Sequence, residues 1–268
     1  MERGKHKNDL EISTREKGKM STGTLGIIPV LGLKIRDERE VDVLNRRLSA
    51  MEKMGVWIQL ESSWEVYSDV GVGEITDAFT ENDVNLASIK FEYKGVFDPE
   101  IFEKIASIAD EAAGRTIIVS GPLQVSLPDI EKIYEIAAMY KVKVLFEPQT
   151  VNGYRPVYAM LTRFIGGVLG LSMVQEVYSS TEHFTSSISR YLQITKNLVI
   201  SNYKGDKPAP LLIPSEYNNP KLLRFLVKNG YEGFLTVFYG KHTVDDRWLL
   251  RELLGLKEQL SALEEKEP

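Results

Sequence analysis

The chain has 268 residues, no cysteine and only three histidines, with 38 acidic and 33 basic side chains. The lack of cysteine excludes disulfides, thiolate nucleophiles, iron–sulfur clusters and cysteine-ligated zinc. His6, His183 and His242 lie far apart with no paired spacing, which argues against a histidine-rich metal site. A formal net charge of -5 argues against a nucleic-acid partner, because general nucleic-acid binders usually carry a basic face.

Residues 1–20 are polar, mix both charges and show no apolar period, so we expect a disordered tail before one domain over 21–268. Met20 directly precedes the first ordered pattern and is an alternative start. No stretch approaches the roughly 20 apolar residues that a bilayer span needs, and the charged N-terminal sequence does not match a secretory signal. These features predict a cytoplasmic protein without a membrane partner, and the composition is compatible with a thermophile.

Apolar, β-rich runs alternate with helical patterns along the chain. Runs of Val, Ile and Leu bounded by turn residues are typical of buried parallel strands. The predicted strands are 24–31, 56–62, 85–92, 115–122, 142–149, 168–174, 197–204 and 234–240. The segment Gly71–Gly73 lacks the strand, spacing and helix of a phosphate loop, so it is predicted to be a flexible loop.

Helical patterns fill most of the intervals between these strands. In the first, Val41, Leu44, Leu48 and Met51 recur at spacings of three and four, and Gly55 ends the pattern. The predicted helices are 41–54, 99–113, 128–140, 156–165, 182–194 and 220–228, with a last helix over about 245–265. The strand–helix units average about 27 residues, which predicts an α/β fold, a single (β/α)8 TIM barrel with a C-terminal helix. A doubly wound open sheet is the less favoured alternative, since no dinucleotide-type glycine loop is present.

The last predicted helix carries an apolar seam that has two interpretations. Its leucines follow spacings of four and three, as in two heptads. The seam either lies on the outer wall of the barrel or joins two subunits into a homo-oligomer. Its members are Leu249, Leu253, Leu256, Leu260 and Leu263.

In a TIM barrel the working residues stand at the carboxyl ends of the strands. Here those positions form a polar collar with few titratable groups. Glu147 follows the apolar run VKVLF, so partial desolvation would raise its pKa toward the range of a general base unless a cation such as Lys90 or Lys204 lies nearby. The collar comprises Gln59, Glu61, Lys90, Glu92, Ser120, Glu147, Ser172, Gln175, Asn202, Lys204, Phe238 and Tyr239.

Several of these segments carry a resemblance to a known group. VLFEPQT, GGVLGLSMVQEV, LVISNYKGD and NNPKLLRFLVKNGYEGFLTVFYG resemble the xylose isomerase-like barrel superfamily, over most of residues 55–240. That superfamily includes sugar-phosphate isomerases and epimerases and DNA repair enzymes of the AP-endonuclease type. The resemblance therefore implies a TIM barrel that acts on, or descends from a protein that acted on, sugars or sugar phosphates.

The resemblance also indicates which metal ligands this chain lacks. Members usually bind divalent metals with Glu, Asp and His at the strand ends, and the metal polarises a carbonyl or phosphate oxygen. Only the fifth-strand glutamate is kept, as Glu147. The other ligand positions correspond to Lys90, Ser120, Ser172, Gln175, Asn202 and Phe238. We therefore expect no catalytic metal and no other cofactor, and DNA repair chemistry, which needs a multi-metal cluster, ranks last.

Two classes of function remain. In the first, Glu147 is the base of a metal-free isomerisation, and Lys90 or Lys204 polarises the carbonyl or, if uncharged, forms a Schiff base. In the second, the barrel is a non-catalytic descendant that binds a small polar or sugar-phosphate ligand or a protein partner, and the glutamate pairs with one of these lysines. The residues expected to hold the ligand are Lys204, Asn202, Ser120, Gln175 and Arg155.

Aromatic side chains in the predicted loops after the strands also allow two interpretations. They either form the wall of a ligand pocket or cover the top of the barrel. They are Trp64, Tyr67, Tyr93, Phe97 and Tyr154.

Overall fold

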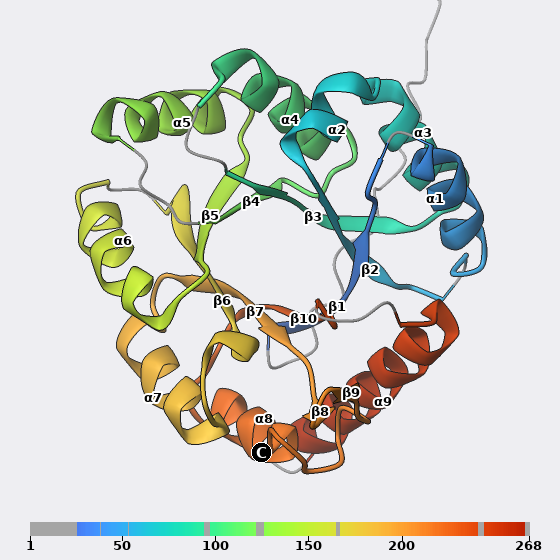
Figure 1. Ribbon diagram of the computed structural model, residues 1–268, viewed down its shortest axis with the longest axis vertical. Coiled ribbons are helices and arrows are strands. Elements are labelled where there is room, and N and C mark those ends of the chain that lie inside the picture. Colours follow the sequence, from blue (N-terminus) through green and yellow to red (C-terminus); the bar gives the residue numbers. More distant parts are fainter. Residues whose placement is uncertain are drawn as a thin grey trace, which may run out of the picture.

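The computed structural model is a closed barrel of eight parallel strands surrounded by helices (Figure 1). It describes residues 26–37, 39–52, 54–93, 97–121, 126–164, 167–240 and 244–265. The order around the barrel is β1-β10-β7-β6-β5-β4-β3-β2, so the last strand pairs with the first. The predicted TIM barrel is confirmed, whereas the predicted tail over 1–20 lies outside the described residues.

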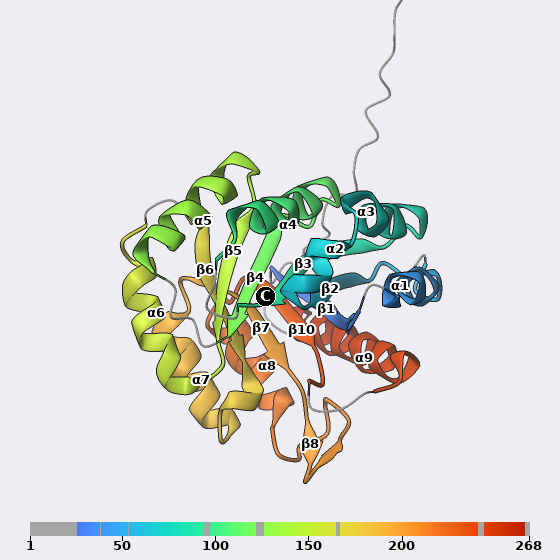
Figure 2. The ribbon, with the colours of Figure 1, turned by 45° about the horizontal axis from the view of Figure 1, so that its top comes forward.

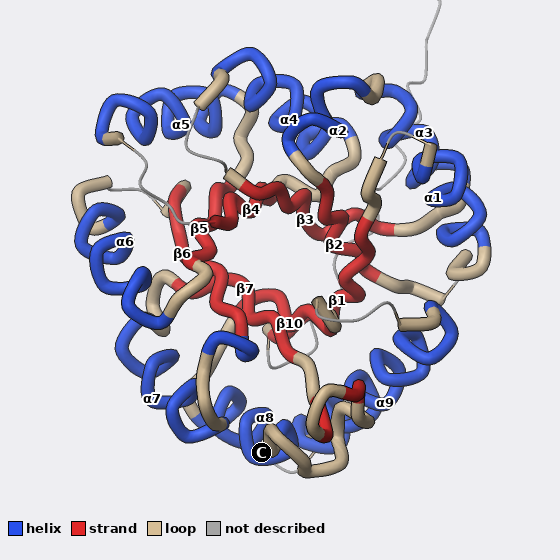
Figure 3. Tube along the Cα trace, in the orientation of Figure 1, coloured by secondary structure: helices blue, strands red, loops and turns tan. Residues whose placement is uncertain are grey.

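The strands form the inner ring of the molecule (Figure 3). All eight predicted strands are found, but three have carboxyl ends shifted by three or more residues. The first runs three residues further than predicted, to Lys34, the seventh ends at Ile200 rather than at Lys204, and the last ends at Val237 rather than at Gly240. The bounds are β1 (Ile27–Lys34), β2 (Trp57–Ser62), β3 (Asn85–Glu92), β4 (Thr116–Gly121), β5 (Lys143–Pro148), β6 (Leu169–Val174), β7 (Thr195–Ile200) and β10 (Gly233–Val237).

A small antiparallel hairpin separates β7 from the helix that follows. It consists of β8 (Tyr203–Lys204) and β9 (Lys207–Pro208), and it projects outward from the barrel (Figure 2). The sequence analysis assigned its first residues to the preceding strand. Gly205 adopts a φ of 59°, which turns the chain between the two short strands.

The helices form the outer ring, and none in the described part of the chain is long and apolar enough to cross a bilayer. Two of them, α2 and α3, were not predicted. Their bounds and those of the others are α1 (Glu40–Ser49), α2 (Trp64–Asp69), α3 (Val72–Glu81), α4 (Pro99–Glu111), α5 (Leu127–Met139), α6 (Tyr154–Leu161), α7 (Thr181–Tyr191), α8 (Asn219–Lys228) and α9 (Asp246–Glu264).

The prediction of a flexible loop at Gly71–Gly73 was wrong. Gly71 is the N-cap of α3, and the next two residues form its first turn. Ile75, Ala78 and Phe79 are buried, at the three- and four-residue spacing of a helix face. This short apolar face belongs to the buried core, and α3 packs against α1 and α4, which stabilises a helix that Gly73 disfavours.

The starts of the other helices follow local chemistry in the sequence. At six of them an N-cap side chain accepts hydrogen bonds from backbone N–H groups of the first turn, which have no partner inside the helix. These N-caps are Ser63, Asp98, Ser126, Ser180, Asn218 and Asp245.

The C-terminal helix lies on the outer wall of the barrel. Leu249, Leu253, Leu256 and Leu260 are buried, and α9 contacts β1, β10 and α8. Of the two interpretations of the leucine seam, packing within one chain is the one observed, and these four side chains are covered by the barrel itself.

One ion pair joins the first and last helices, which lie side by side in Figures 1 and 2. Arg47 of α1 donates from Nε to Asp246 Oδ2 and from Nη2 to Asp246 Oδ1, both at 2.6 Å. Its Nη1 also donates to the carbonyl oxygen of Lys34 at 3.1 Å. This bidentate contact fixes the end of β1 relative to both helices.

We predict that Arg47→Met lowers the free energy of unfolding by about 1–2 kcal/mol, because a bidentate charged pair is lost while the aliphatic stem is kept. Urea denaturation measures the change. Lys132→Met is the control: its partner Glu135 is also exposed, so its effect should stay within about 0.5 kcal/mol. A double-mutant cycle with Asp246→Asn that gives no coupling energy contradicts the assignment.

Candidate functional site

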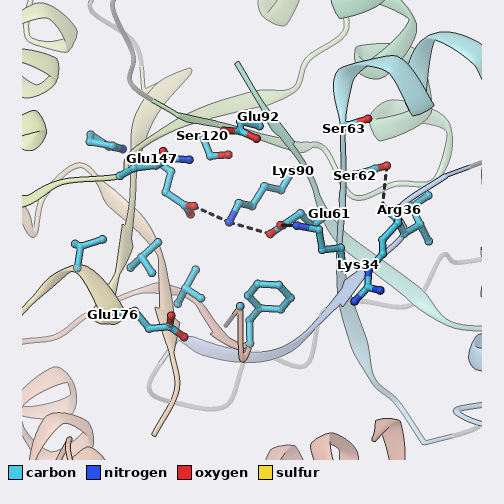
Figure 4. Close-up of a pocket in the computed structure, with 18 residues that line it drawn as sticks. Lys34, Arg36, Glu61, Ser62, Ser63, Lys90, Glu92, Ser120, Glu147 and Glu176 are labelled. Carbon is cyan, nitrogen blue, oxygen red and sulfur yellow. Dashed lines mark hydrogen bonds and ion pairs between the residues drawn. The ribbon is translucent and has the colours of Figure 1, made fainter. Parts of the chain in front are cut away.

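A pocket of about 380 Å³ opens among the carboxyl ends of the strands (Figure 4). This is the end of a TIM barrel where ligands bind. Charged and polar groups dominate its β1–β5 side, whereas Val174, Val199 and Phe238 provide apolar surface from β6, β7 and the segment after β10. The lining residues are Lys34, Ile35, Arg36, Glu61, Ser62, Ser63, Lys90, Glu92, Ser120, Glu147, Pro148, Gln149, Val174, Glu176, Val177, Val199, Phe238 and Gly240.

A row of alternating charges crosses this pocket. Lys90 Nζ lies 2.7 Å from Glu147 Oε1 and 2.9 Å from Glu61 Oε2. The other oxygen of Glu61, Oε1, lies 2.9 Å from Lys34 Nζ. Strand register produces the row, because Lys34 pairs with Glu61 across β1 and β2, and Glu61 pairs with Lys90 across β2 and β3.

The central lysine is buried but charged. Only 8% of Lys90 and 2% of Glu147 is exposed. Burial lowers the pKa of Lys90, but the negative charges of Glu147 and Glu61 outweigh burial and raise that pKa above its usual value. This direction argues against the sequence-based expectation that an uncharged Lys90 forms a Schiff base.

The same charges act on the second carboxylate. Burial raises the pKa of Glu61, but Lys90 and Lys34 outweigh burial, so that the pKa is lowered. Glu61 stood in the predicted collar without a role. The structure makes it the second acid of the row, on the opposite side of Lys90 from Glu147 (Figure 4).

A chain of hydrogen bonds from β10, β7 and β6 ends at the carboxylate of Glu147. Thr236 Oγ1 donates to Asn197 Oδ1 at 2.8 Å, and Asn197 Nδ2 donates to Ser172 Oγ at 2.9 Å. The hydroxyl of Ser172 therefore donates its hydrogen onward, to Glu147 Oε2 at 2.5 Å. With Lys90 on Oε1, both oxygens of Glu147 accept, which is the arrangement of an ionised carboxylate.

A buried amide completes this polar layer. Gln59 Oε1 accepts from Ser88 and Asn197 at 3.4 and 3.1 Å, and it lies 3.3 Å from Thr236 Oγ1, whose one hydrogen has its closer acceptor in Asn197. Its Nε2 has no hydrogen-bond partner among the described residues. The sequence analysis missed Ser88, Asn197 and Thr236; the available signal was a polar residue inside an otherwise apolar strand.

Three of the predicted site residues lie together in the pocket lining: Glu147, Lys90 and Ser120. Ser120 is opposite Glu147 in the register of β4 and β5. Its hydroxyl donates to the carbonyl oxygen of Phe91 at 3.1 Å, so the oxygen of this side chain can still accept from a ligand.

Two other predicted ligand-binding residues fix loops and are absent from the pocket lining. Gln175 is fully buried, donates to Asn219 Oδ1 at 2.8 Å and accepts from the backbone N–H of Ser201 at 3.1 Å. Asn202 donates to the carbonyl oxygens of Pro210 and Ile213 at 2.9 and 2.6 Å. Both positions organise the chain between β7 and α8.

The last two predicted ligand-binding residues are exposed and lie outside the lining. Lys204 belongs to β8 of the projecting hairpin, and Arg155 belongs to α6. The partner of Glu147 is therefore Lys90 rather than Lys204.

None of the five aromatic residues predicted at the mouth lines the pocket. Tyr67 and Tyr154 are buried, and their hydroxyls bond to backbone groups, as expected of side chains that cover the barrel. The aromatic surface of the pocket is instead Phe238, whose ring centroid lies 5.7 Å from Lys90 Nζ. Gly32 makes room for this ring, since a Cβ there would lie 2.7 Å from Phe238 Cδ2.

The side chains of the pocket do not fit a divalent metal. Glu61 and Glu147 both form ion pairs with the ammonium group of Lys90, which places positive charge between the two carboxylates. Within the described residues, no group of three or more His, Cys, Asp or Glu side chains could hold a metal ion. The lack of a catalytic metal in solution stays a prediction.

Comparisons with known proteins place this fold. No protein-family model matches the chain, and no curated protein sequence matches it. D-allulose 3-epimerase from Methylomonas sp. superposes with a TM-score of 0.59 at 11% identity, over 86% of this chain and 98% of the epimerase. A xylose isomerase domain protein from Planctomyces limnophilus superposes with a TM-score of 0.52 at 11% identity, over 88% of this chain and 95% of that protein.

The chain has the fold of the xylose isomerase-like TIM barrels. Orotidine 5'-monophosphate decarboxylase from Methanocaldococcus jannaschii, with a TM-score of 0.51 at 11% identity over 86% of this chain and 97% of that one, shares the architecture. At these identities the likeness concerns the fold alone. What this barrel does must be derived from its own side chains.

We predict that Lys90→Met lowers the free energy of unfolding by about 3–5 kcal/mol at pH 7, because two largely buried carboxylates lose their shared cation. Lys34→Met is the matched control. Its side chain is 51% exposed and Glu61 keeps Lys90, so the expected loss is only about 0–1 kcal/mol. Denaturant titration of both variants measures the difference, and equal losses contradict the central role of Lys90.

The penalty of Lys90→Met should shrink as the pH falls. In the wild type, the lowered pKa of Glu61 adds stability above about pH 4.3, the ordinary value for glutamate, and this is lost as the pH falls through the folded-state pKa. The raised pKa of Lys90 adds stability below about pH 10.4, lost as the pH rises through its folded-state value. Without Lys90, burial favours the protonated forms of the two carboxyl groups. Lowering the pH should therefore reduce the loss of stability in the variant. Denaturation at pH 7 and pH 4.5 tests this, and a constant difference contradicts it.

Proposed function

We propose that this barrel binds a small sugar or sugar phosphate at the mouth of the barrel and isomerises or epimerises it without a metal, with Glu147 as the base and Lys90 as the electrophile. The observation that carries the proposal is the buried Glu147–Lys90 pair, 2.7 Å apart, in the wall of an open pocket. An ion pair that only filled a vestigial site would leave no such cavity beside it.

The pocket suits a polyhydroxylated ligand in size and chemistry. Its volume of about 380 Å³ falls in the range of small-molecule sites. Carboxylates accept hydrogen bonds from sugar hydroxyls, and ammonium groups donate to them. Phe238 and the neighbouring valines offer an apolar surface to the C–H face of a sugar.

The proposed step needs only a base and a hydrogen-bond donor. The Glu147 carboxylate removes the proton from the carbon next to the carbonyl, while the Lys90 ammonium donates to the carbonyl oxygen and stabilises the charge that develops there. For the isomer, Glu147 returns the proton to the former carbonyl carbon while the hydroxyl proton on the neighbouring carbon passes to the former carbonyl oxygen, so that a new carbonyl forms. For the epimer, solvent in the open pocket protonates the opposite face of the same carbon and Glu147 releases its proton to solvent.

A non-catalytic, ligand-binding barrel is the second candidate, and one observation favours it. Both oxygens of Glu147 already accept, from Lys90 and from Ser172, which weakens the carboxylate as a base. In this interpretation the row of charges is a rigid set of donors and acceptors for hydroxyl groups, and the same pocket serves recognition alone.

The decisive experiment incubates the purified protein with aldoses, ketoses and their phosphates in D2O containing EDTA. Proton NMR follows exchange of the hydrogen next to the carbonyl, and calorimetry follows binding. We predict exchange in the wild type and a loss of at least about 100-fold in rate in Glu147→Gln, with binding retained.

Glu258→Gln, an exposed position on α9, is the matched control and should exchange at the wild-type rate. Binding without exchange supports the second candidate. If no sugar or sugar phosphate binds, both candidate functions are overturned. If exchange occurs without EDTA but not in its presence, the metal-free step is overturned.

A further inference from the structure

The cations of the pocket are unevenly distributed. Lys34 and Arg36, at the end of β1 and just beyond it, lie on one side with Ser62 and Ser63 of the adjoining β2 segment (Figure 4). Glu92, Glu147 and Glu176 line other parts of the same pocket. An anionic group at those acids would meet like charges. At the β1 edge it would meet two cations and one carboxylate, Glu61, whose charge Lys90 also balances.

We infer that the ligand carries an anionic group, a phosphate or a carboxylate, and that this group binds at the β1 edge between Lys34 and Arg36. This inference rests on the proposed function, because it assigns the charged end of the ligand whose carbonyl lies at Lys90. It selects sugar phosphates and sugar acids over neutral sugars.

Lys34 is suited to receive such a group. Its side chain is 51% exposed, and its ammonium contacts Glu61 Oε1 at 2.9 Å. Glu61 keeps Lys90 on its other oxygen, so Lys34 can turn toward an anion without leaving a buried carboxylate unpaired. Lysine on a flexible stem is a common phosphate ligand.

The neighbouring groups add donors of the right kind. Arg36 lines the pocket beside Lys34, and a guanidinium group binds phosphate or carboxylate oxygens in pairs. Ser63 accepts from the backbone N–H of Val66 at 3.4 Å, so its own hydroxyl hydrogen can be donated to an anion.

The geometry also limits the length of the ligand. Lys34 and Lys90 contact the two oxygens of one carboxylate, Glu61, each at 2.9 Å. The two ammonium groups are therefore separated by no more than two contacts of 2.9 Å and the carboxylate group between them. A short ligand that carries its anionic group a few bonds from the carbonyl spans this distance.

Calorimetric titration with D-ribose 5-phosphate, D-gluconate, D-ribose and inorganic phosphate tests the inference. We expect the phosphate ester or the sugar acid to bind at least tenfold more tightly than D-ribose, and its affinity to fall with added salt. The two anionic probes distinguish a phosphate from a carboxylate site.

Arg36→Gln and Lys34→Gln should each lower the affinity for the anionic probe at least fivefold and leave the affinity for D-ribose unchanged. Lys228→Gln, an exposed lysine at the end of α8, is the matched control and should change neither. Glu147→Gln should bind the anionic probe with unchanged affinity, because the Glu147 carboxylate is not part of the anion site.

The outcomes separate this inference from the proposed function. Tighter binding of D-ribose than of its phosphate overturns the anion site alone, as does anion binding that both β1-edge variants leave intact. Absence of binding by all sugars and sugar derivatives overturns the anion site and the proposed function together.

Discussion

The ammonium group of Lys90 between Glu61 and Glu147 is the interaction on which the barrel mouth depends. A buried charge is tolerated only when it is paired and hydrogen-bonded, and here each partner is supported in turn. Lys34 supports Glu61, while Ser172, Asn197 and Thr236 support Glu147 in sequence. One chain of polar contacts thus links β1, β2, β3, β5, β6, β7 and β10, so the positions of the candidate reacting groups are set by the closure of the barrel itself.

This construction explains how a barrel of this fold can retain a polar centre with few metal-binding side chains. A buried lysine places positive charge and hydrogen-bond donors between two carboxylates, and its pKa is raised because they outweigh burial. The same row leaves a second, more exposed cation, Lys34, at the rim beside Arg36. In the proposed function, the inner cation orients the reacting atoms and the outer cation recognises the ligand.

The errors of the sequence analysis come from strand ends and from short helices. The eight-fold alternation was visible because each strand is a compact apolar run, but the end of β1 was placed three residues early, which left Lys34 and Arg36 out of the collar. The end of β7 was placed late, which brought Asn202 and Lys204 into it, although one fixes a loop and the other belongs to a hairpin. Strand ends follow from pairing with neighbours, such as Lys34 with Glu61, and that pairing is not encoded locally.

The sequence by itself determined the barrel, the outer position of most helices, and the special place of Glu147 after a buried strand. It also excluded thiol chemistry, because no cysteine is present. Only the tertiary structure decided that Glu147 pairs with Lys90, that Glu61 is a second acid, and that Gln175 and Asn202 hold the chain together away from the pocket. The physical reason is that a residue's own segment sets its secondary structure, whereas its charge partners come from strands that only barrel closure brings into register.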